Sequence, residues 1–161
     1  MNPFFFITRW FWALCIVMSF VNAAIMKYRA APYIRANPEL EAGYRTIISG
    51  MLIWGDIPFI VMGIGCVVGK IPSVFFFFQL HDGNPYVIAF YVSIFLTWIL
   101  GANWIIFRGG AEMLVKHPGV LNVNLKSPRT VTFLTLLSLA VGITWFLLIY
   151  FQVFRMPVPP G

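Results

Sequence analysis

The feature that most constrains this chain is a series of four long apolar runs. They cover Phe4–Met26, Thr46–Gly69, Tyr86–Phe107 and Val131–Phe154. A helix needs about 20 apolar residues to cross ~30 Å of hydrocarbon, so each run is long enough to span a bilayer. The chain is only 10% charged, whereas a soluble domain carries about 25% charged residues. We therefore predict an all-α, polytopic membrane protein, with four transmembrane helices in a small bundle that forms a single domain over residues 1–161.

Each run is preceded by a capping residue and a proline. Asn and Ser side chains accept hydrogen bonds from the free amides of a first helical turn, and a proline at the first position loses no bond there. The four pairs are Asn2-Pro3, Asn37-Pro38, Asn84-Pro85 and Ser127-Pro128. Together with the apolar runs, they predict helices at about 4–26, 38–69, 85–107 and 128–154.

The basic residues are concentrated in two connections, 27–45 and 108–130. Their members are Lys27, Arg29, Arg35, Arg45, Arg108, Lys116, Lys126 and Arg129. The positive-inside rule places both connections in the cytoplasm and both termini on the other side of a bacterial inner membrane or an equivalent membrane. The net charge of +6 is thus interpreted as topology and contact with anionic headgroups, with no nucleic-acid partner. A cleavable signal sequence at the N-terminus is the alternative, but cleavage would place both basic connections outside.

Asp56 is the main candidate for a functional residue. It is the only acid deep inside an apolar run, where an ionised carboxylate costs several kcal/mol unless it is paired, hydrated or protonated. Pro58 removes a backbone donor, so we expect the second helix to be kinked near Asp56 and Pro58. Arg9 lies about 8 Å shallower at ~1.5 Å per residue, and we interpret it as an interfacial anchor, with pairing to an inward acid as the alternative. We expect Asp56 to be neutral and bonded to freed backbone, or to face a hydrated cleft or another chain.

Other small and polar residues inside the runs predict contacts between helices. Asn22 and Asn103 each precede the first basic residue by five positions, and a bond between the two amides would contribute ~0.6–2 kcal/mol. Close helix packing is predicted at Gly65 and Gly69, and along a ladder of Ala89, Ser93, Thr97 and Gly101. Cys15 and Cys66 differ in depth by more than ~10 Å, so we expect two free thiols.

The connections carry weaker patterns. Residues 70–84 include the apolar stretch Val74–Phe78, which is too short to span and predicts an interfacial or re-entrant segment. Residues 111–116 predict a short surface helix that lies in the interface or docks a partner. We expect His117 to be a turn residue and 27–45 to be a solvated loop, the alternative being contact of that loop with anionic lipid or a partner subunit.

No catalytic motif or metal-ligand set is present. The two histidines, His81 and His117, lie in connections on opposite sides, and two cysteines cannot hold an iron–sulfur cluster. We predict no catalytic residue, metal or cofactor, while 17 Phe allow contacts with lipid, quinone or pigment.

Three functions fit these patterns. The first is an accessory or scaffold subunit, without chemistry of its own, of a larger membrane complex such as a respiratory or photosynthetic one. Its partners would be the lipid bilayer and either other membrane subunits or a second copy of the chain. The alternative is a small oligomeric transporter or ion-coupled carrier that uses Asp56. The third, a membrane enzyme acting on lipid or quinone, has the least support because no convergent polar set is visible.

Overall fold

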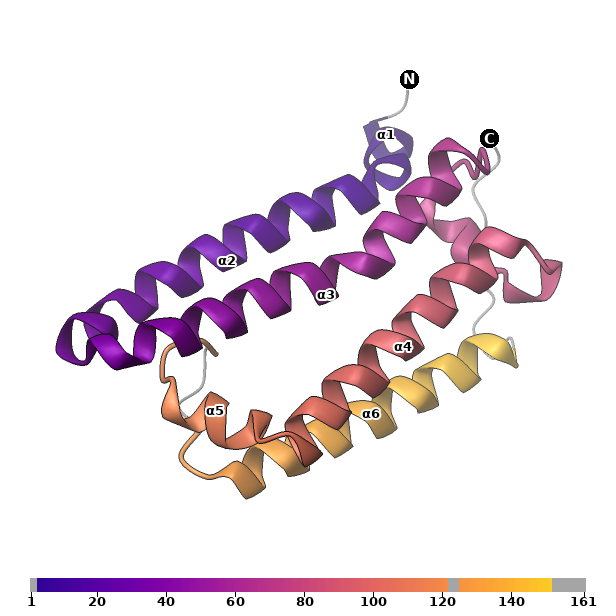
Figure 1. The fold of residues 1–161 in the computed structure, drawn as a ribbon. Coiled ribbons are helices and arrows are strands. Elements are labelled where there is room, and N and C mark those ends of the chain that lie inside the picture. Colours follow the sequence, from indigo (N-terminus) through magenta and orange to yellow (C-terminus); the bar gives the residue numbers. More distant parts are fainter. Residues whose placement is uncertain (1–2, 122–124, 152–161) are drawn as a thin grey trace.

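A computed structural model of the chain describes residues 3–121 and 125–151, and their side chains from residue 6 onward. The helices are α1 (Pro3–Arg9), α2 (Phe11–Ala36), α3 (Glu41–Val67), α4 (Pro85–Phe107), α5 (Gly110–Lys116) and α6 (Pro128–Tyr150), with short 3₁₀ segments η1 (Pro38–Leu40), η2 (Val74–Phe78) and η3 (Leu80–Asp82) (Figure 1). Among the described residues, four stretches are long and apolar enough to cross a membrane: Phe11–Ala36, Pro38–Val67, Pro85–Phe107 and Pro128–Tyr150. The predicted all-α, polytopic helical bundle is confirmed. Asn2 and the expected end of the fourth helix, 152–154, lie outside the described residues.

The predicted helix starts are observed at three positions. The Asn37 side chain accepts a hydrogen bond from the Glu39 amide at 3.2 Å, and the Asn84 side chain accepts one from the Tyr86 amide at 3.0 Å. Ser127 makes no such bond, although Pro128 does begin α6. These local contacts place the starts of η1 and α4 independently of how the helices pack.

The first span differs from the expected 4–26. The helix breaks at Trp10, whose φ of −98° and ψ of 13° are not helical, so α1 is inclined to α2 (Figure 1). At its other end α2 continues through Pro32 to Ala36. The expected loop is therefore largely helical, because α2 keeps packing against α3 beyond Met26, with Ala30 fully buried.

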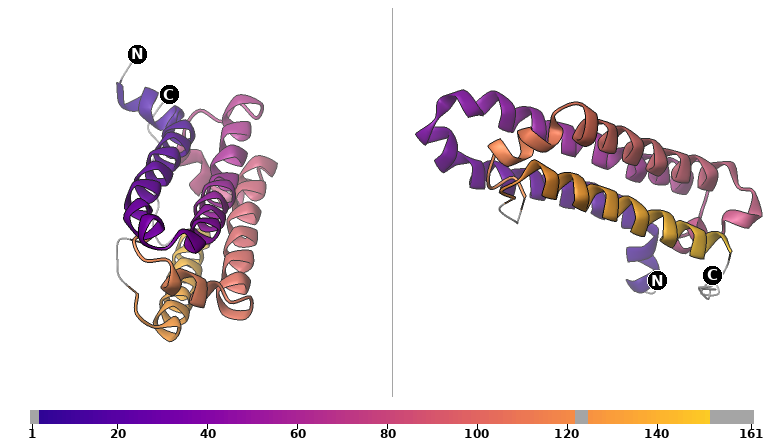
Figure 2. Two further views of the ribbon diagram at one scale, coloured as in Figure 1. Left: turned by 60° about the vertical axis from the view of Figure 1, so that its left-hand side comes forward. Right: turned by 90° about the horizontal axis from the view of Figure 1, so that it is seen from below.

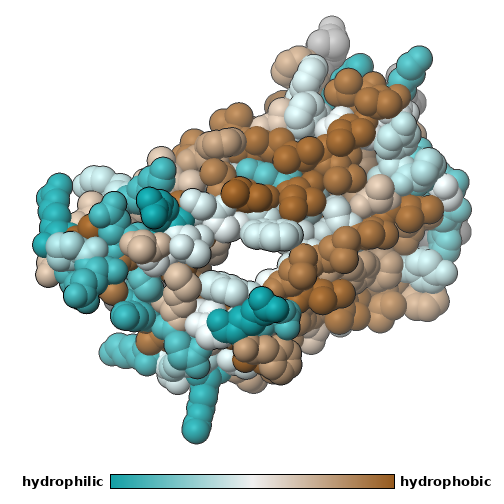
Figure 3. All heavy atoms as spheres, in the orientation of Figure 1, coloured by the Kyte–Doolittle hydropathy of each residue, from teal (hydrophilic) through white to brown (hydrophobic). Residues whose placement is uncertain are grey.

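The spanning helices pack as a row in chain order. α2 lies against α3, α3 against α4, and α4 against α6, which also contacts α5 (Figure 2). α2 comes close to α3 at Gly63, where an added Cβ would meet the ring of Trp12. α1 and the last turn of α6 lie at one end of the molecule, and the two basic connections lie at the other, where hydrophilic residues gather (Figure 3).

Two separate cores hold this row together. The basic-end core consists of Ala23, Met26, Ala30, Tyr44, Ile47, Ile48 and Val120. The opposite-end core consists of Met62, Cys66, Ile71, Phe77, Val87 and Tyr91. Phe77 is only 1% exposed, so the apolar connection that contains η2 folds against the helices.

His117 lies at the bend that follows α5, as expected, and its side chain is also part of the core, which was not expected. It is 5% exposed, and its Nδ1 donates a hydrogen bond to the Met113 carbonyl at 2.6 Å. Its ring lies edge-on to that of Tyr44, with centroids 4.8 Å apart, and the Tyr44 hydroxyl donates to the Pro118 carbonyl at 2.7 Å. The second basic connection is thereby fastened to the first.

Candidate functional site

Asp56 lies in α3, buried among apolar side chains. It is 6% exposed, and its Oδ1 is a fully buried atom for which the described residues supply no hydrogen-bond partner. Pro58 lies within the same helix and is also buried. Because proline has no N–H, the carbonyl of Trp54 lacks its usual helical partner. An unpartnered carboxyl oxygen next to a proline is therefore the most unusual polar arrangement in α3.

The face of α3 that carries Asp56 points toward α2. Asp56 precedes Gly63 by seven residues, about two helical turns, so both lie on one side of α3. Gly63 is the position that meets Trp12 of α2. The Cys15 thiol of α2 lies within electrostatic range of Asp56. The carboxyl is thus enclosed between two helices that are both apolar at this depth.

Arg9 does not reach Asp56. It ends α1, is exposed, and lies within electrostatic range of Cys66 instead. No ion pair joins Arg9 to Asp56, and the interpretation of Arg9 as an interfacial anchor stays a prediction.

The expected bond between Asn22 and Asn103 is not formed. Asn22 is exposed on α2 and Asn103 is exposed on α4, and α3 lies between these two helices in the row. Equal depth in the sequence was the reason for pairing them. Two side chains that bond must lie at the same depth and also on neighbouring helices. The sequence indicated the depth, and the packing order of the helices decided which helices are neighbours.

The predicted packing residues have different surroundings. Gly65 and Gly69 are approached by Tyr86 of α4, and Gly65 also by Phe77. Ser93 is buried and donates to the Phe90 carbonyl at 2.6 Å, while Thr97 donates to the Ser93 carbonyl at 2.8 Å. Ala89 is exposed, and a Cβ at Gly101 would meet open space.

Several close approaches at glycines were not predicted from the sequence. Two of them are Gly63 against Trp12 and Gly142 of α6 against the ring of Trp98 in α4. Each pairs a glycine with a tryptophan on another helix. A lone glycine in an apolar run does not reveal which neighbour approaches it.

The site has few chemical options. Among the described residues, no group of three or more His, Cys, Asp or Glu side chains converges. The thiols of Cys15 and Cys66 are free, as expected, half-buried and buried respectively. Asp56 can accept a hydrogen bond or carry a proton.

The fold and this site define a polytopic, α-helical membrane protein with one buried intramembrane carboxyl. No protein-family model, curated protein or solved structure matches the chain. A function is therefore inferred from the geometry of the described residues.

Proposed function

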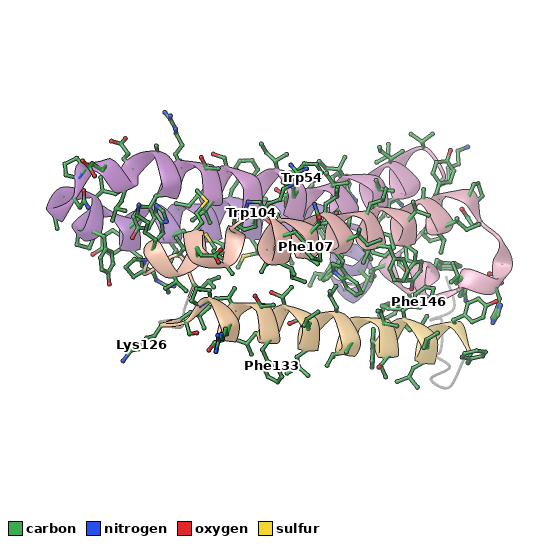
Figure 4. All side chains as sticks on the ribbon, turned by 60° about the horizontal axis from the view of Figure 1, so that its bottom comes forward. Trp54, Trp104, Phe107, Lys126, Phe133 and Phe146 are labelled. Atoms are coloured by element: carbon green, nitrogen blue, oxygen red, sulfur yellow. The ribbon has the colours of Figure 1, made fainter. Side chains whose placement is uncertain are left out.

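We propose that the chain is an accessory or scaffold subunit that binds a neighbouring membrane chain through α6. The observation that carries this proposal is that α6 is almost entirely unburied: within Pro128–Tyr150, Val131 is the one buried residue. The helix packs on α4 through residues such as Gly142 and Phe146 and leaves its other side uncovered. Figure 4 shows Phe133 pointing away from the other helices.

The uncovered side of α6 has a groove and small residues of the kind found where two membrane helices make contact. A shallow groove of about 340 Å³ is lined by Ala140, Val141, Thr144, Trp145 and Leu148. Ala140 and Thr144 are exposed there, and the Thr144 hydroxyl is already bonded to the Ala140 carbonyl at 2.8 Å. In lipid, small residues support association because they let another helix approach closely. The partner is therefore an apolar transmembrane helix with a large side chain that fills the groove.

Purification in mild detergent from the native membrane tests this proposal. We expect stoichiometric partner chains to remain bound, and Ala140→Trp to release them by filling the groove. Ile143→Trp is the matched control, because Ile143 is 48% exposed on α6 but outside the groove. A chain that purifies alone, or an Ala140→Trp variant that keeps its partners, would contradict the proposal.

A second function, a small oligomeric carrier that uses Asp56, is favoured by the unpartnered Oδ1. Intramembrane acids commonly mark ion or proton pathways. In vesicles that contain the reconstituted chain and a pH-sensitive dye, Asp56→Asn is expected to abolish flux. Asp82→Asn is the control, because Asp82 is exposed in η3. Equal flux from both variants would remove the carrier mechanism.

We also infer that the basic connections face the cytoplasm, on the positive-inside rule. A membrane-impermeant thiol reagent added to right-side-out vesicles is then expected to label Asp82→Cys and to spare Arg35→Cys. The reverse pattern would invert the topology.

A further inference from the structure

One stripe of α3 is packed at both ends and uncovered in its middle. Residues spaced alternately by three and four positions share one side of a helix. The stripe is Tyr44, Ile48, Met51, Gly55, Pro58 and Met62, of which Pro58 is also buried. Its ends are buried in the two cores, with Tyr44 at 1% and Met62 at 3% exposure. Between them Met51 is 42% exposed, and a Cβ at Gly55 would meet nothing within 4 Å.

The facing helix α4 shows the same change along its length. Val87 and Tyr91, near its start, are buried in the opposite-end core. Gly101 follows Val87 by fourteen residues, four helical turns on the same side. A Cβ at Gly101 would meet nothing within 4 Å.

Along α3 and α4 these uncovered positions lie between the two cores, and an opening separates the two helix pairs (Figure 3). The space-filling view looks through the molecule between the α2–α3 pair and the segment formed by α4 and α5 (Figure 3). The basic-end core and the opposite-end core close the packing on either side. We call the positions Met51, Gly55 and Gly101 the window.

We propose that the window binds the hydrocarbon chain of an anionic phospholipid from the leaflet on the basic side. Arg108 is exposed and directly follows the last residue of α4, seven residues after Gly101 and about 10 Å nearer the basic end. One leaflet supplies about 15 Å of the ~30 Å hydrocarbon. A lipid phosphate at Arg108 therefore leaves its acyl chain long enough to pass Gly101.

The charges at this end favour an anionic headgroup. The exposed basic residues are Lys27, Arg29, Arg35, Arg45, Arg108, Lys116, Lys126 and Arg129, against the exposed acids Glu39, Glu41 and Glu112. Basic pockets between membrane helices on the basic side recognise anionic lipid headgroups. Zwitterionic lipid lacks the net charge that this arrangement selects.

A single acyl chain fits the window better than a transmembrane helix does. A transmembrane helix is about 10–12 Å in diameter. To enter the window, it would have to separate α3 from α4, which are packed together in the opposite-end core. An acyl chain is narrow enough to enter while both cores stay closed. A second copy of this protein is therefore a poorer occupant than a lipid.

Native mass spectrometry of the full chain, released from vesicles of equal phosphatidylglycerol and phosphatidylcholine, tests the proposal. We expect one phosphatidylglycerol to stay bound. Gly101→Leu and Gly55→Leu, which fill the window, are each expected to lower its retention roughly tenfold, the factor that corresponds to about 1.4 kcal/mol. Gly50→Leu is the matched control: it introduces the same side chain into open space on α3, on a different side from Gly55, and should leave retention unchanged.

The headgroup contact has its own pair of variants. Arg108→Gln should shift retention toward equal amounts of the two lipids, whereas Arg35→Gln, near the end of α2, should not. Circular dichroism checks that each variant is folded. Brominated lipids provide a readout without mutation: brominated phosphatidylglycerol should quench the tryptophan fluorescence of the native sequence more strongly than brominated phosphatidylcholine does. The proposal is overturned if the native chain keeps both lipids equally, if folded Gly101→Leu and Gly55→Leu keep phosphatidylglycerol undiminished, or if chain dimers appear without lipid.

Discussion

The helices α3 and α6 look alike in sequence and differ in their place in the fold. Both are long and apolar, and α6 is the more hydrophobic of the two. Yet α3 contains nine buried residues, whereas α6 contains one, Val131. High hydropathy indicates that a segment leaves water for the bilayer, but it does not indicate whether lipid or protein covers that segment.

The difference comes from position in the row and from small residues. α3 lies between α2 and α4, and its glycines at 63 and 65 let Trp12 and Tyr86 approach closely. α6 has α4 on one side, where Gly142 receives Trp98. A helix is buried where its neighbours on two sides can come near its backbone.

The largest expected effect is that of Gly63→Leu in α3. The new side chain would occupy the space of the Trp12 ring, and overpacking of this kind costs about 1–3 kcal/mol. Unfolding by a detergent titration, followed by circular dichroism, measures the loss. Gly50→Leu on the same helix is the control, since open space surrounds Gly50. Equal stability of the two variants would show that α2 and α3 do not pack at Gly63.

On α6, Phe146→Ala is expected to lower the free energy of unfolding by about 2 kcal/mol. Its ring lies 4.7 Å from that of Phe95 and 5.4 Å from that of Tyr91, and each aromatic pair is worth about 0.5–1.5 kcal/mol. Phe133→Ala, at a site 63% exposed, should change stability by less than about 0.5 kcal/mol. The same titration compares them, and a larger loss at Phe133 would reverse the assignment of the two faces.

Asp56→Leu is expected to raise the free energy of unfolding by about 1–2 kcal/mol. Replacing a buried polar group that lacks a partner by an apolar one of similar size is neutral or stabilising. The change sharpens the comparison, because it asks whether the one acid of α3 stabilises the fold or is kept for another reason. A stability lower than that of the native chain would show that the carboxyl braces the helix.

The smallest expected effect is that of Tyr44→Phe, about 1 kcal/mol. It removes the hydrogen bond to the Pro118 carbonyl, and one such bond contributes about 0.5–1.5 kcal/mol. Hydrogen exchange at the amides of His117, Gly119 and Val120 is expected to become faster, because this bond fastens the second basic connection to α3. Exchange that stays as slow as in the native chain would mean that the His117 ring alone holds the segment.

Much of the local structure could be predicted because its causes are local. Asn37 and Asn84 supply caps to amides two residues away, and the surface helix expected at 111–116 is α5, Gly110–Lys116. The candidate site was also located, since an acid within an apolar run is visible without a fold. The missing hydrogen-bond partner of Asp56 could not be predicted in full, because Oδ1 is shut off from other partners only when α2 and α3 pack around it.

The sequence alone determined that four apolar segments span a membrane and that Asp56 lies within one of them, because length, hydropathy and capping act along the chain. Tertiary structure alone decided that α3 is enclosed, that α6 is uncovered, that His117 is buried and that Asn22 lies away from Asn103. The physical reason is that every apolar face is equally compatible with lipid. The partner of each face is therefore chosen by shape, where a glycine admits a large ring, and by the order in which the helices pack.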